Sequence, residues 1–217
     1  MQSHLRAAAG ISLADVLPYG RSYGEKVRFS ACSSDWAHCQ PGDLFVAIVG
    51  DEEDGHEFAR EAVERGAVMV LAERPLALPV PVCVVEDTRE AYGHVCQALA
   101  GHPAARLSVI GVTGTNGKTT TSLLIQSILH AAGRPSGSLT SLGYDDTVES
   151  EPAKRTTSQP EQAKWMAQML ANGCSHAVVE LSSRELATRR PAGVKLQAAV
   201  LTNLRRDHLD FHGSLAN

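Results

Sequence analysis

The sequence lacks an apolar run long enough to cross a membrane, and it has no excess of positive charge. Its longest apolar stretch, residues 77–85, is interrupted by Pro79 and Pro81 and falls well short of the about 20 residues that a transmembrane helix needs. A formal net charge of −4 over 217 residues gives no general attraction to nucleic acid or anionic membranes. The first residues also lack the pattern of a signal peptide. We therefore expect a cytoplasmic protein that acts on small molecules, without nucleic acid or membrane insertion.

Cysteine is scarce and unpaired. The five cysteines are widely spaced and include no C-x-x-C pair, which is typical neither of a disulfide framework nor of a zinc site. We expect reduced, mostly buried thiols. The rest of the composition, 43% hydrophobic and 20% charged, is that of a globular chain with room for one large domain or two small ones. The sequence does not indicate an oligomeric state.

The first half of the sequence alternates strand-like and helix-like segments. Strands are predicted at residues 43–48, 68–71 and 82–85, and a helix at 57–65 with Gly66 at its end. A further helix is predicted from Asp87, whose carboxylate can cap it, with Glu90 three residues on. This alternation is typical of a small α/β domain, which we assign to residues 1–103.

The second half predicts a larger α/β domain, residues 104–217. Its predicted elements are a strand at 108–112, a helix at 118–132 with Leu124, Ile128 and Ala131 at helical spacing, a helix from Ser158 to 172–173, and strands at 177–179 and 198–201. Ser158 and Glu161 form a capping box at the start of the second helix. The last two apolar runs are continuous, which predicts buried parallel strands. Residues 136–157 are polar and poorly periodic.

The strongest chemical signal is the loop GVTGTNGKTT, residues 111–120, between the predicted strand and helix. Glycines let successive backbone N–H groups point at phosphate oxygens, and the helix N-terminus adds positive potential. Lys118 can reach the terminal phosphates, and Thr119 can ligate magnesium. The common phosphate-loop pattern would place glycine at Val112, whereas this loop has glycines at positions 111, 114 and 117. The alternative is a chance glycine-rich turn before a helix with an exposed lysine.

Two further polar segments directly follow predicted buried strands. Glu180 ends one strand, and Asn203 follows the next. Because ligands bind at the carboxyl ends of parallel strands, a carboxylate at position 180 can hold the magnesium ion that bridges phosphates. A surface carboxylate is the alternative. His208, Asp210 and His212 could also suggest a zinc site, but a polar loop or a magnesium site with one imidazole fits them better.

The combination of GTNGKTT, ELSS and TNLRRDHLDFH resembles the Mur ligases, most closely the branch that acts on UDP-N-acetylmuramoyl-dipeptide. In the first half, PGDLFVA (residues 41–47), DGHEF (54–58) and Gly66-Ala67 are similar to the domain that holds the uridine nucleotide in that family. The resemblance implies a small α/β domain for the UDP-sugar, followed by an incomplete P-loop-type ATPase domain with a parallel sheet. It also implies a ligase that forms an acyl phosphate with ATP and lets an amino group displace phosphate.

The resemblance implies roles for individual residues as well. ATP would be bound by Gly114, Thr115, Asn116, Gly117, Lys118, Thr119, Thr120 and Asn203. Magnesium would be held by Thr119, Glu180 and His208, and the catalytic residues would be Lys118, Glu180 and His208. Metal ions stabilise the charge that develops during phosphoryl transfer.

Four residues match positions that contact the muramoyl-peptide in the family: Thr156, Thr157, Ser182 and Arg190. An arginine suits a carboxylate or phosphate because its guanidinium donates two parallel hydrogen bonds. For the threonines an ordinary polar loop remains an alternative, and for Arg190 so does a solvated surface charge.

The sequence departs from the family pattern at several positions. Ser-Ser-His-Gly becomes Ser182-Ser183-Arg184-Glu185, a frequent glutamine becomes Thr188, and Asp-Ser-Arg becomes Asp35-Trp36-Ala37. These changes affect the expected uridine and muramoyl contacts and leave the ATP site intact.

The chain stops at Asn217, so we expect a fragment that does not by itself catalyse ligation and whose half-built sheet exposes an apolar edge. Two alternatives remain open: a folylpolyglutamate-type or cyanophycin-type ligase, and a non-catalytic protein that binds nucleotide or UDP-sugar. The expected substrates are the UDP-N-acetylmuramoyl-dipeptide and an amino acid, but no residue indicates which amino acid is added.

Overall fold

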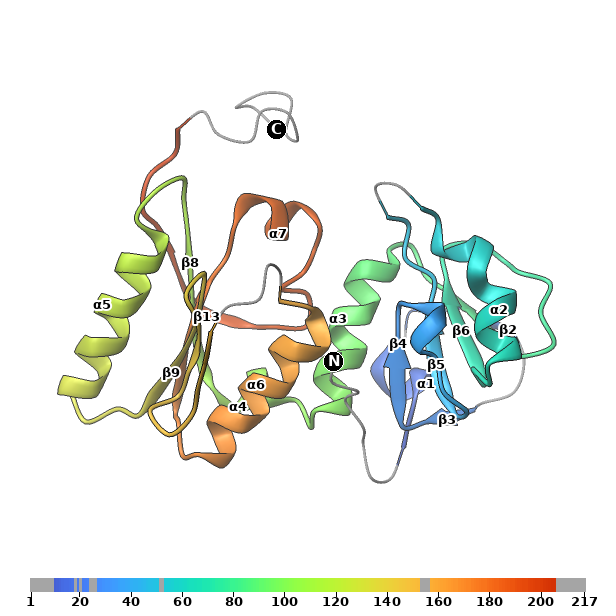
Figure 1. Ribbon diagram of the computed structural model, residues 1–217, viewed down its shortest axis with the longest axis horizontal. Helices are drawn as coiled ribbons and strands as arrows, with labels where there is room; N and C mark the ends of the chain where they lie inside the picture. The colour runs from blue at the N-terminus through green and yellow to red at the C-terminus, as the bar shows by residue number, and fades with distance from the viewer. Residues whose placement is uncertain are drawn as a thin grey trace. The chain divides into compact units, whose positions relative to one another are not determined.

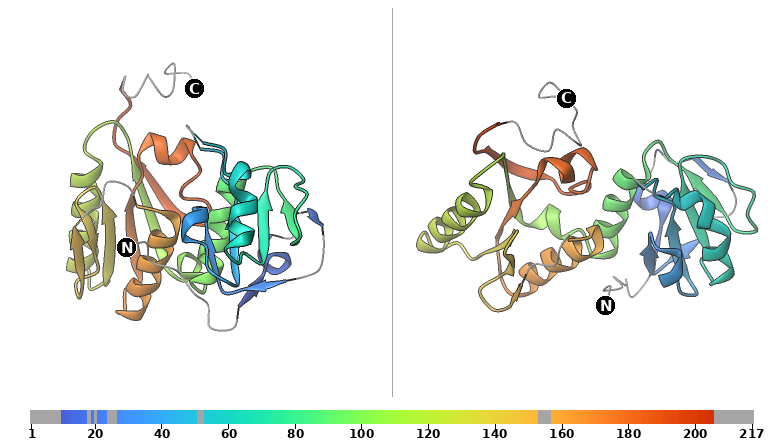
Figure 2. Two further views of the ribbon diagram at one scale, coloured as in Figure 1. Left: turned by 45° about the vertical axis from the view of Figure 1, so that its right-hand side comes forward. Right: turned by 45° about the horizontal axis from the view of Figure 1, so that its top comes forward.

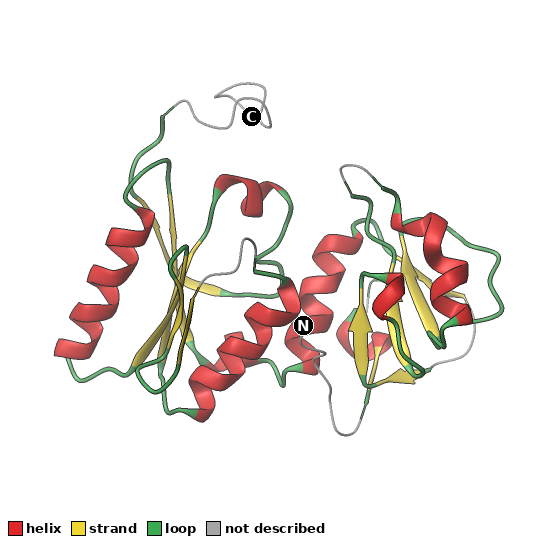
Figure 3. Cartoon of the chain, in the orientation of Figure 1, coloured by secondary structure: helices red, strands yellow, loops and turns green. Residues whose placement is uncertain are grey.

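The computed structural model describes residues 10–17, 19, 21–23, 27–50, 53–152 and 157–205. The chain divides into two compact units, residues 1–102 and 103–217 (Figure 1). Both units are mixed α/β structures with parallel strands, as predicted, and Figure 3 distinguishes their helices from their strands. Within the described part of the chain, no helix is long and apolar enough to cross a membrane.

The first unit contains a five-stranded sheet in the order β2-β7-β6-β5-β4. The strands are β2 (Arg21–Tyr23), β7 (Val82–Val84), β6 (Met69–Ala72), β5 (Asp43–Val46) and β4 (Ala31–Ser33). Strands β4 to β7 are parallel, and β2 is antiparallel to β7. A separate antiparallel pair joins β1 (Ile11–Ser12) to β3 (Arg28–Phe29). The three strands predicted for this half are confirmed, with small differences at their ends.

Three α-helices and two 3₁₀ turns complete the described part of the first unit. They are α1 (Leu13–Val16), η1 (Trp36–His38), η2 (Gly55–Phe58), α2 (Ala59–Glu64) and α3 (Thr88–Leu99). Helix α3 begins as predicted, because the Asp87 side chain accepts a hydrogen bond from the Glu90 N–H. The predicted helix at 57–65 is a 3₁₀ turn followed by the short helix α2.

The second unit contains a six-stranded sheet in the order β11-β10-β9-β12-β8-β13. The strands are β8 (Ser108–Thr113), β9 (Ser136–Thr140), β10 (Gly143–Asp145), β11 (Ser150–Pro152), β12 (His176–Glu180) and β13 (Leu196–Leu201). Strands β9, β12, β8 and β13 are parallel, and β10 and β11 add an antiparallel hairpin at one edge. This is the parallel sheet that the sequence predicts.

Helices cover both faces of this sheet (Figures 1 and 2). They are α4 (Pro103–Arg106), α5 (Lys118–Ala131), α6 (Gln159–Ala171) and α7 (Ser183–Ala187). Helix α5 lies on one face, and α4 and α6 lie on the other, where Trp165, Met166 and Met169 are buried in the apolar core. Helices α5 and α6 are confirmed, including the capping box of Ser158 and Glu161.

The sequence did not predict strands β9, β10 and β11. Strand β9 begins with two serines around a glycine, Ser136, Gly137 and Ser138, and this segment does not resemble an apolar strand. The glycine at position 137 has a structural reason: a Cβ atom there would lie 2.7 Å from the Met169 side chain. Helix α6 therefore packs against this strand too closely for a larger residue.

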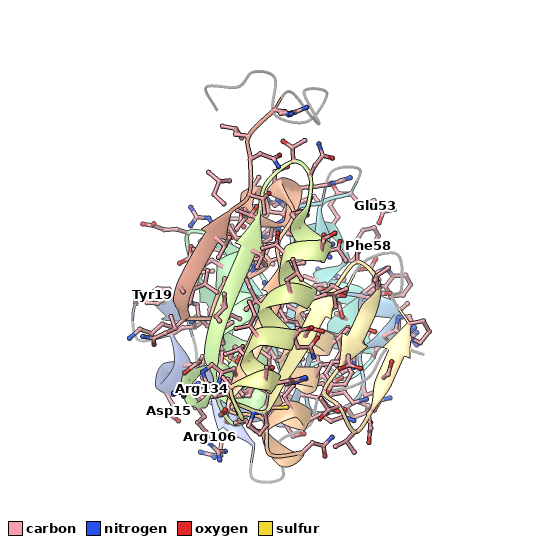
Figure 4. All side chains as sticks on the ribbon, turned by 90° about the vertical axis from the view of Figure 1, so that its left-hand side faces the viewer. Asp15, Tyr19, Glu53, Phe58, Arg106 and Arg134 are labelled. Carbon is pink, nitrogen blue, oxygen red and sulfur yellow. The ribbon has the colours of Figure 1, made fainter. Side chains whose placement is uncertain are left out.

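The burial predicted for residues 198–201 is wrong. Strand β13 is parallel to β8, as predicted, but it is an edge strand, and Leu201 is 63% exposed. Helix α5 also carries exposed apolar residues, since Leu124 is 58% and Ile128 is 67% exposed. Figure 4 shows α5 lying across the sheet and β13 at its edge. The edge strand is exposed and apolar, as expected of this sheet.

Candidate phosphate and metal site

The predicted site lies where three parallel strands of the second unit end. Glu180, the last residue of β12, pairs with Val112 of β8, and Leu201 of β13 pairs with Thr113. The carboxyl ends of β8, β12 and β13 therefore share one edge of the sheet. The loop of residues 114–117 follows β8 at this edge and leads into α5, as ligand-binding loops in parallel α/β sheets do.

The loop presents backbone donors and a lysine ammonium group. Gly117 directly precedes α5, has a φ of 81° and has no side chain to cap the helix, so the first N–H groups of α5 are available to an anion. The Lys118 Nζ atom donates hydrogen bonds to the carbonyl oxygens of Gly114 at 2.8 Å and Thr115 at 3.1 Å. The ammonium group thus lies over the loop, where the oxygens of a phosphate can replace these carbonyl oxygens as hydrogen-bond acceptors.

Three oxygen-bearing side chains lie beside the start of α5. The Thr119 hydroxyl donates to Glu180 Oε2 at 2.9 Å and lies 2.8 Å from Ser141 Oγ. The Ser141 N–H donates to the same carboxylate oxygen at 3.0 Å. The sequence predicted the roles of Thr119 and Glu180, and the structure places the two residues in contact. Ser141 escaped prediction because it follows β9, which the sequence did not reveal.

Residues 202–203 hold the loop from the side of β13. The Thr202 hydroxyl donates to the Asn116 carbonyl oxygen at 2.7 Å, and Asn203 Nδ2 donates to the same oxygen at 2.9 Å. Asn203 also accepts hydrogen bonds, at Oδ1 from the Asn116 N–H and at its carbonyl oxygen from the Thr115 N–H, both at 3.1 Å. We call these four bonds the loop clamp.

The loop clamp explains where the glycine lies in the phosphate loop. A Cβ atom on Gly114 would lie 2.2 Å from Thr202 Oγ1 and 2.8 Å from the Asn203 carbonyl oxygen. Only glycine fits at position 114, because residues 202–203 lie so close to it. The glycine pattern of the sequence showed that this loop differs from the common one but did not show this reason. Both ends of the Asn203 side-chain amide form hydrogen bonds with the loop backbone, which indicates that Asn203 holds the loop in place. Its predicted contact with ATP stays a prediction.

Two of the predicted muramoyl-peptide residues, Thr157 and Arg190, are in contact in the same unit. Arg190 Nη1 donates to the Thr157 carbonyl oxygen at 2.8 Å. Gln159 Nε2 lies within hydrogen-bond distance of the Arg189 and Arg190 carbonyl oxygens, at 3.4 and 3.3 Å. Gln159 is a buried residue that the sequence did not single out, because its partners are 30 residues away.

Ser182 has a local partner. It caps α7 and forms a capping box with Glu185, one of the residues that depart from the family pattern. The Thr188 hydroxyl donates to the Arg184 carbonyl oxygen at 2.8 Å, within the same turn.

Several predicted residues lie outside the described residues: Thr156, His208, Asp210 and His212. Their proposed roles stay predictions. Within the described part of the chain, no group of three or more histidine, cysteine or acidic side chains could hold a metal ion.

The motif Asp54-Gly-His-Glu-Phe58 in the first unit is stabilised by hydrogen bonds to the Asp54 carboxylate. Asp54 Oδ1 accepts hydrogen bonds from the His56 N–H at 3.0 Å and from His56 Nδ1 at 2.6 Å, and Oδ2 accepts one from Arg74 at 2.8 Å. The backbone hydrogen bond from His56, together with these other donors, lowers the pKa of Asp54 well below its usual range. The Glu73 N–H donates to His56 Nε2 at 2.8 Å, so Nδ1 carries the imidazole proton.

Two protein-family models match the chain. The Mur ligase middle domain matches residues 112–217, and the model described as Mur ligase family, catalytic domain, matches residues 30–100.

Curated relatives are similar over most of the chain. A UDP-N-acetylmuramoyl-L-alanyl-D-glutamate--2,6-diaminopimelate ligase of Geobacillus thermodenitrificans is 44% identical over 188 residues, which cover 85% of this chain and 38% of the relative. A UDP-N-acetylmuramyl-tripeptide synthetase of Deinococcus radiodurans is 43% identical over 188 residues, or 83% of this chain and 38% of the relative. The chain therefore spans less than two fifths of the length of these relatives.

Solved structures show the same fold. A UDP-N-acetylmuramoyl-L-alanyl-D-glutamate--2,6-diaminopimelate ligase matches with a TM-score of 0.80 and 26% identity, covering 95% of this chain and 43% of the other. The MurF ligase of Thermotoga maritima in complex with ADP matches with a TM-score of 0.54 and 25% identity, covering 85% of this chain and 40% of the other.

Proposed function

The chain belongs to the Mur ligase family, and from this premise we propose that it carries the ATP-binding loop of a ligase that extends UDP-N-acetylmuramoyl-dipeptide by one amino acid. Lys118 and the N–H groups at the start of α5 bind the phosphates. The observation that carries this proposal is the position of Lys118 over the loop, beside the Thr119 and Glu180 pair at the same sheet edge.

The reaction proceeds in two steps. An oxygen of the substrate carboxylate attacks the terminal phosphorus of ATP, which forms an acyl phosphate and releases ADP. The amino group of the incoming amino acid then attacks the carbonyl carbon, the bond from that carbon to the phosphate oxygen breaks, and an amide, inorganic phosphate and a proton released to solvent are formed. Lys118 stabilises the negative charge that develops on the transferred phosphoryl group, because its ammonium group is fixed close to the loop.

Magnesium fits the oxygen donors of this site. The Thr119 hydroxyl group lies within hydrogen-bond distance of both the Ser141 hydroxyl group and the Glu180 carboxylate, and all three are hard oxygen ligands. When bound, the ion neutralises charge on the phosphate oxygens. We assign Thr119 and Glu180 as its ligands, with Ser141 positioning both, and keep His208 as a proposed ligand.

Thr157, Ser182 and Arg190, together with Thr156, are proposed to bind the muramoyl-peptide. Support comes from the hydrogen bond between Arg190 and the Thr157 carbonyl, which keeps two of these residues together. The names of the relatives favour 2,6-diaminopimelate as the added amino acid, and this choice, like the cytoplasmic location, remains a proposal.

Calorimetric titration of the chain with a non-hydrolysable ATP analogue, with and without magnesium, tests the ATP site. We expect Lys118→Ala to abolish detectable binding in both conditions, since the loop loses its cation. Glu180→Gln should remove the gain in affinity that magnesium provides and leave metal-free affinity close to that of wild type, because the Glu180 carboxylate accepts its hydrogen bonds from Thr119 and Ser141 and not from the phosphate loop.

Lys164→Ala, which removes an exposed lysine on α6, is the matched control and should bind as wild type does. Equal loss of binding in the Lys118 and Glu180 variants, with and without magnesium, would contradict the separate roles. Wild-type protein that binds no nucleotide would contradict the proposed function itself.

A further inference from the structure

Two buried thiols of the first unit lie in contact with each other. The Sγ atoms of Cys32 and Cys96 are 4.0 Å apart, although the residues are 64 positions apart in the sequence. Cys32 lies in β4, and Cys96 lies in α3. The other cysteines, Cys39, Cys83 and Cys174, are also buried and free, but within the described residues no such contact joins them to another thiol. The fold therefore brings together one pair of thiols.

This pair needs only a small movement to form a disulfide bond. Such a bond is about 2.05 Å long, so the two sulfur atoms must approach each other by about 2 Å. Rotation of the two side chains or a shift of β4 supplies this approach. Strand β4 has three residues and, among the described strands, lies at the edge of its sheet beside β5. A short edge strand opens more readily than a central strand, because it separates from fewer partners.

The two thiols have different surroundings, which gives them different roles in oxidation. Burial raises the pKa of the Cys96 thiol well above its usual range, so Cys96 stays neutral. The side chain of Tyr92, one turn earlier on α3, forms a hydrogen bond with Cys96 and holds it in place. Cys32 is 5% exposed and Cys96 is 1% exposed. Cys32 is therefore the thiol that an oxidant reaches first when β4 opens.

We propose that Cys32 and Cys96 form a reversible disulfide site that is oxidised by hydrogen peroxide and that cross-links β4 to α3. This modification is independent of the proposed ligase reaction, because it concerns residues of the first unit alone.

The oxidation has two steps. The Cys32 thiolate attacks one oxygen of hydrogen peroxide, the O–O bond breaks, and a sulfenic acid and hydroxide are formed. The Cys96 sulfur then attacks the Cys32 sulfur, the S–O bond breaks as the S–S bond forms, and the leaving hydroxyl group takes the Cys96 proton to become water. Overall the thiols lose two electrons and two protons, and peroxide is reduced to two molecules of water. A dithiol such as dithiothreitol reverses the change by thiol–disulfide exchange.

The cross-link should stabilise the folded chain. It joins residues 64 positions apart, and a disulfide that closes a long loop restricts the unfolded chain more than one that closes a short loop. We expect oxidation to raise the urea midpoint of unfolding by about 1–2 M. Dithiothreitol should return the midpoint to its original value.

The test is treatment of the folded 217-residue chain with hydrogen peroxide. Free thiols are then alkylated in denaturant, and the linked peptides are identified by mass spectrometry. We expect Cys32 linked to Cys96. Oxidation of the urea-unfolded chain should instead favour pairs that are close in sequence, such as Cys32 with Cys39. Such a difference would show that the fold selects the pair.

Variants of single cysteines test the pair separately. Cys32→Ala and Cys96→Ala should each abolish both the cross-link and the rise in urea midpoint. Cys83→Ala, which removes another buried thiol of the first unit, is the matched control and should keep both.

Three results would overturn the inference. The first is a folded wild-type chain that keeps its thiols or forms a Cys32 sulfinic acid without a cross-link. The second is a folded chain that links Cys32 to Cys39 as often as to Cys96. The third is a cross-linked chain whose urea midpoint is unchanged, which would show that the bond does not staple β4 to α3 in the folded state.

Discussion

Replacing Gly114 with alanine tests whether residues 202–203 shape the phosphate loop. The new Cβ atom would lie 2.2 Å from Thr202 Oγ1 and 2.8 Å from the Asn203 carbonyl oxygen. Side-chain rotation could move the Thr202 hydroxyl, but the second contact is with backbone. The loop and residues 202–203 must therefore separate, and the loop clamp cannot keep its geometry.

The cost can be worked out from the clamp. It contains four hydrogen bonds, each with a net contribution of about 1 kcal/mol. Gly114 also has a φ of 135°, where a side chain adds about 1–3 kcal/mol of backbone strain. Complete loss of the clamp would lower the free energy of unfolding by roughly 5 kcal/mol or more, and partial loss by about half of that.

Gly117→Ala is the matched control, because Gly117 lies in the same loop with a φ of 81° and a Cβ atom there would meet nothing within 4 Å. It should show backbone strain alone, about 1–3 kcal/mol. Urea denaturation measures both variants, and titration with an ATP analogue should show that Gly114→Ala loses nucleotide affinity. A Gly114→Ala protein that is as stable as Gly117→Ala and binds nucleotide as wild type does would refute the loop clamp.

Two other predictions concern the surface of α5 and the buried thiols. Ile128 is 67% exposed, so Ile128→Lys should change the free energy of unfolding by no more than about 0.5 kcal/mol. The substitution should also reduce self-association, which light scattering measures. A loss of several kcal/mol would show that Ile128 is covered by a neighbouring element and would contradict this prediction. Burial raises the pKa of Cys39 from 9.0 to about 12 and that of Cys174 to about 11. These thiols bind protons more tightly in the folded state, so their contribution to stability is complete below pH 9 and is lost as the pH rises through these values. Denaturation titrations across this range should show a falling free energy of unfolding, and a Cys39→Ala protein should show a smaller fall; an unchanged slope would contradict the assignment.

Local sequence signals predicted the elements that depend on neighbouring residues. The hydrogen bond from the Glu90 N–H to Asp87 and the capping box of Ser158 and Glu161 involve residues three apart, and both form as predicted. The phosphate loop was equally readable, because a strand, a glycine-rich turn and a helix follow one another directly. The contact between Thr119 and Glu180 spans 61 residues. The resemblance to the Mur ligases implied it, because that resemblance gives both residues to one magnesium ion.

Contacts that depend on tertiary packing could not be predicted. Gly137 reads as a turn residue, but it lies in β9 because α6 approaches it closely. Gln126 reads as a surface residue of α5, but it is buried and its amide donates to the Ser136 carbonyl oxygen at 3.2 Å. Ser141 depends on the same strand, so the missing strand also concealed a residue of the candidate site.

The apolar residues of α5 and β13 show why a hydrophobic pattern cannot locate the core by itself. Leu124 and Ile128 have the spacing that ordinarily marks a buried helix face, but α5 faces its sheet with the small and polar side chains of Ser122 and Gln126. Strand β13 is apolar and continuous, but within the described residues it has β8 alone as a neighbour. An apolar pattern indicates that burying those side chains would be favourable. Whether they are buried depends on a neighbouring element that covers them. The Ile128→Lys experiment distinguishes these two conditions, because the substitution is costly only where such a neighbour is present.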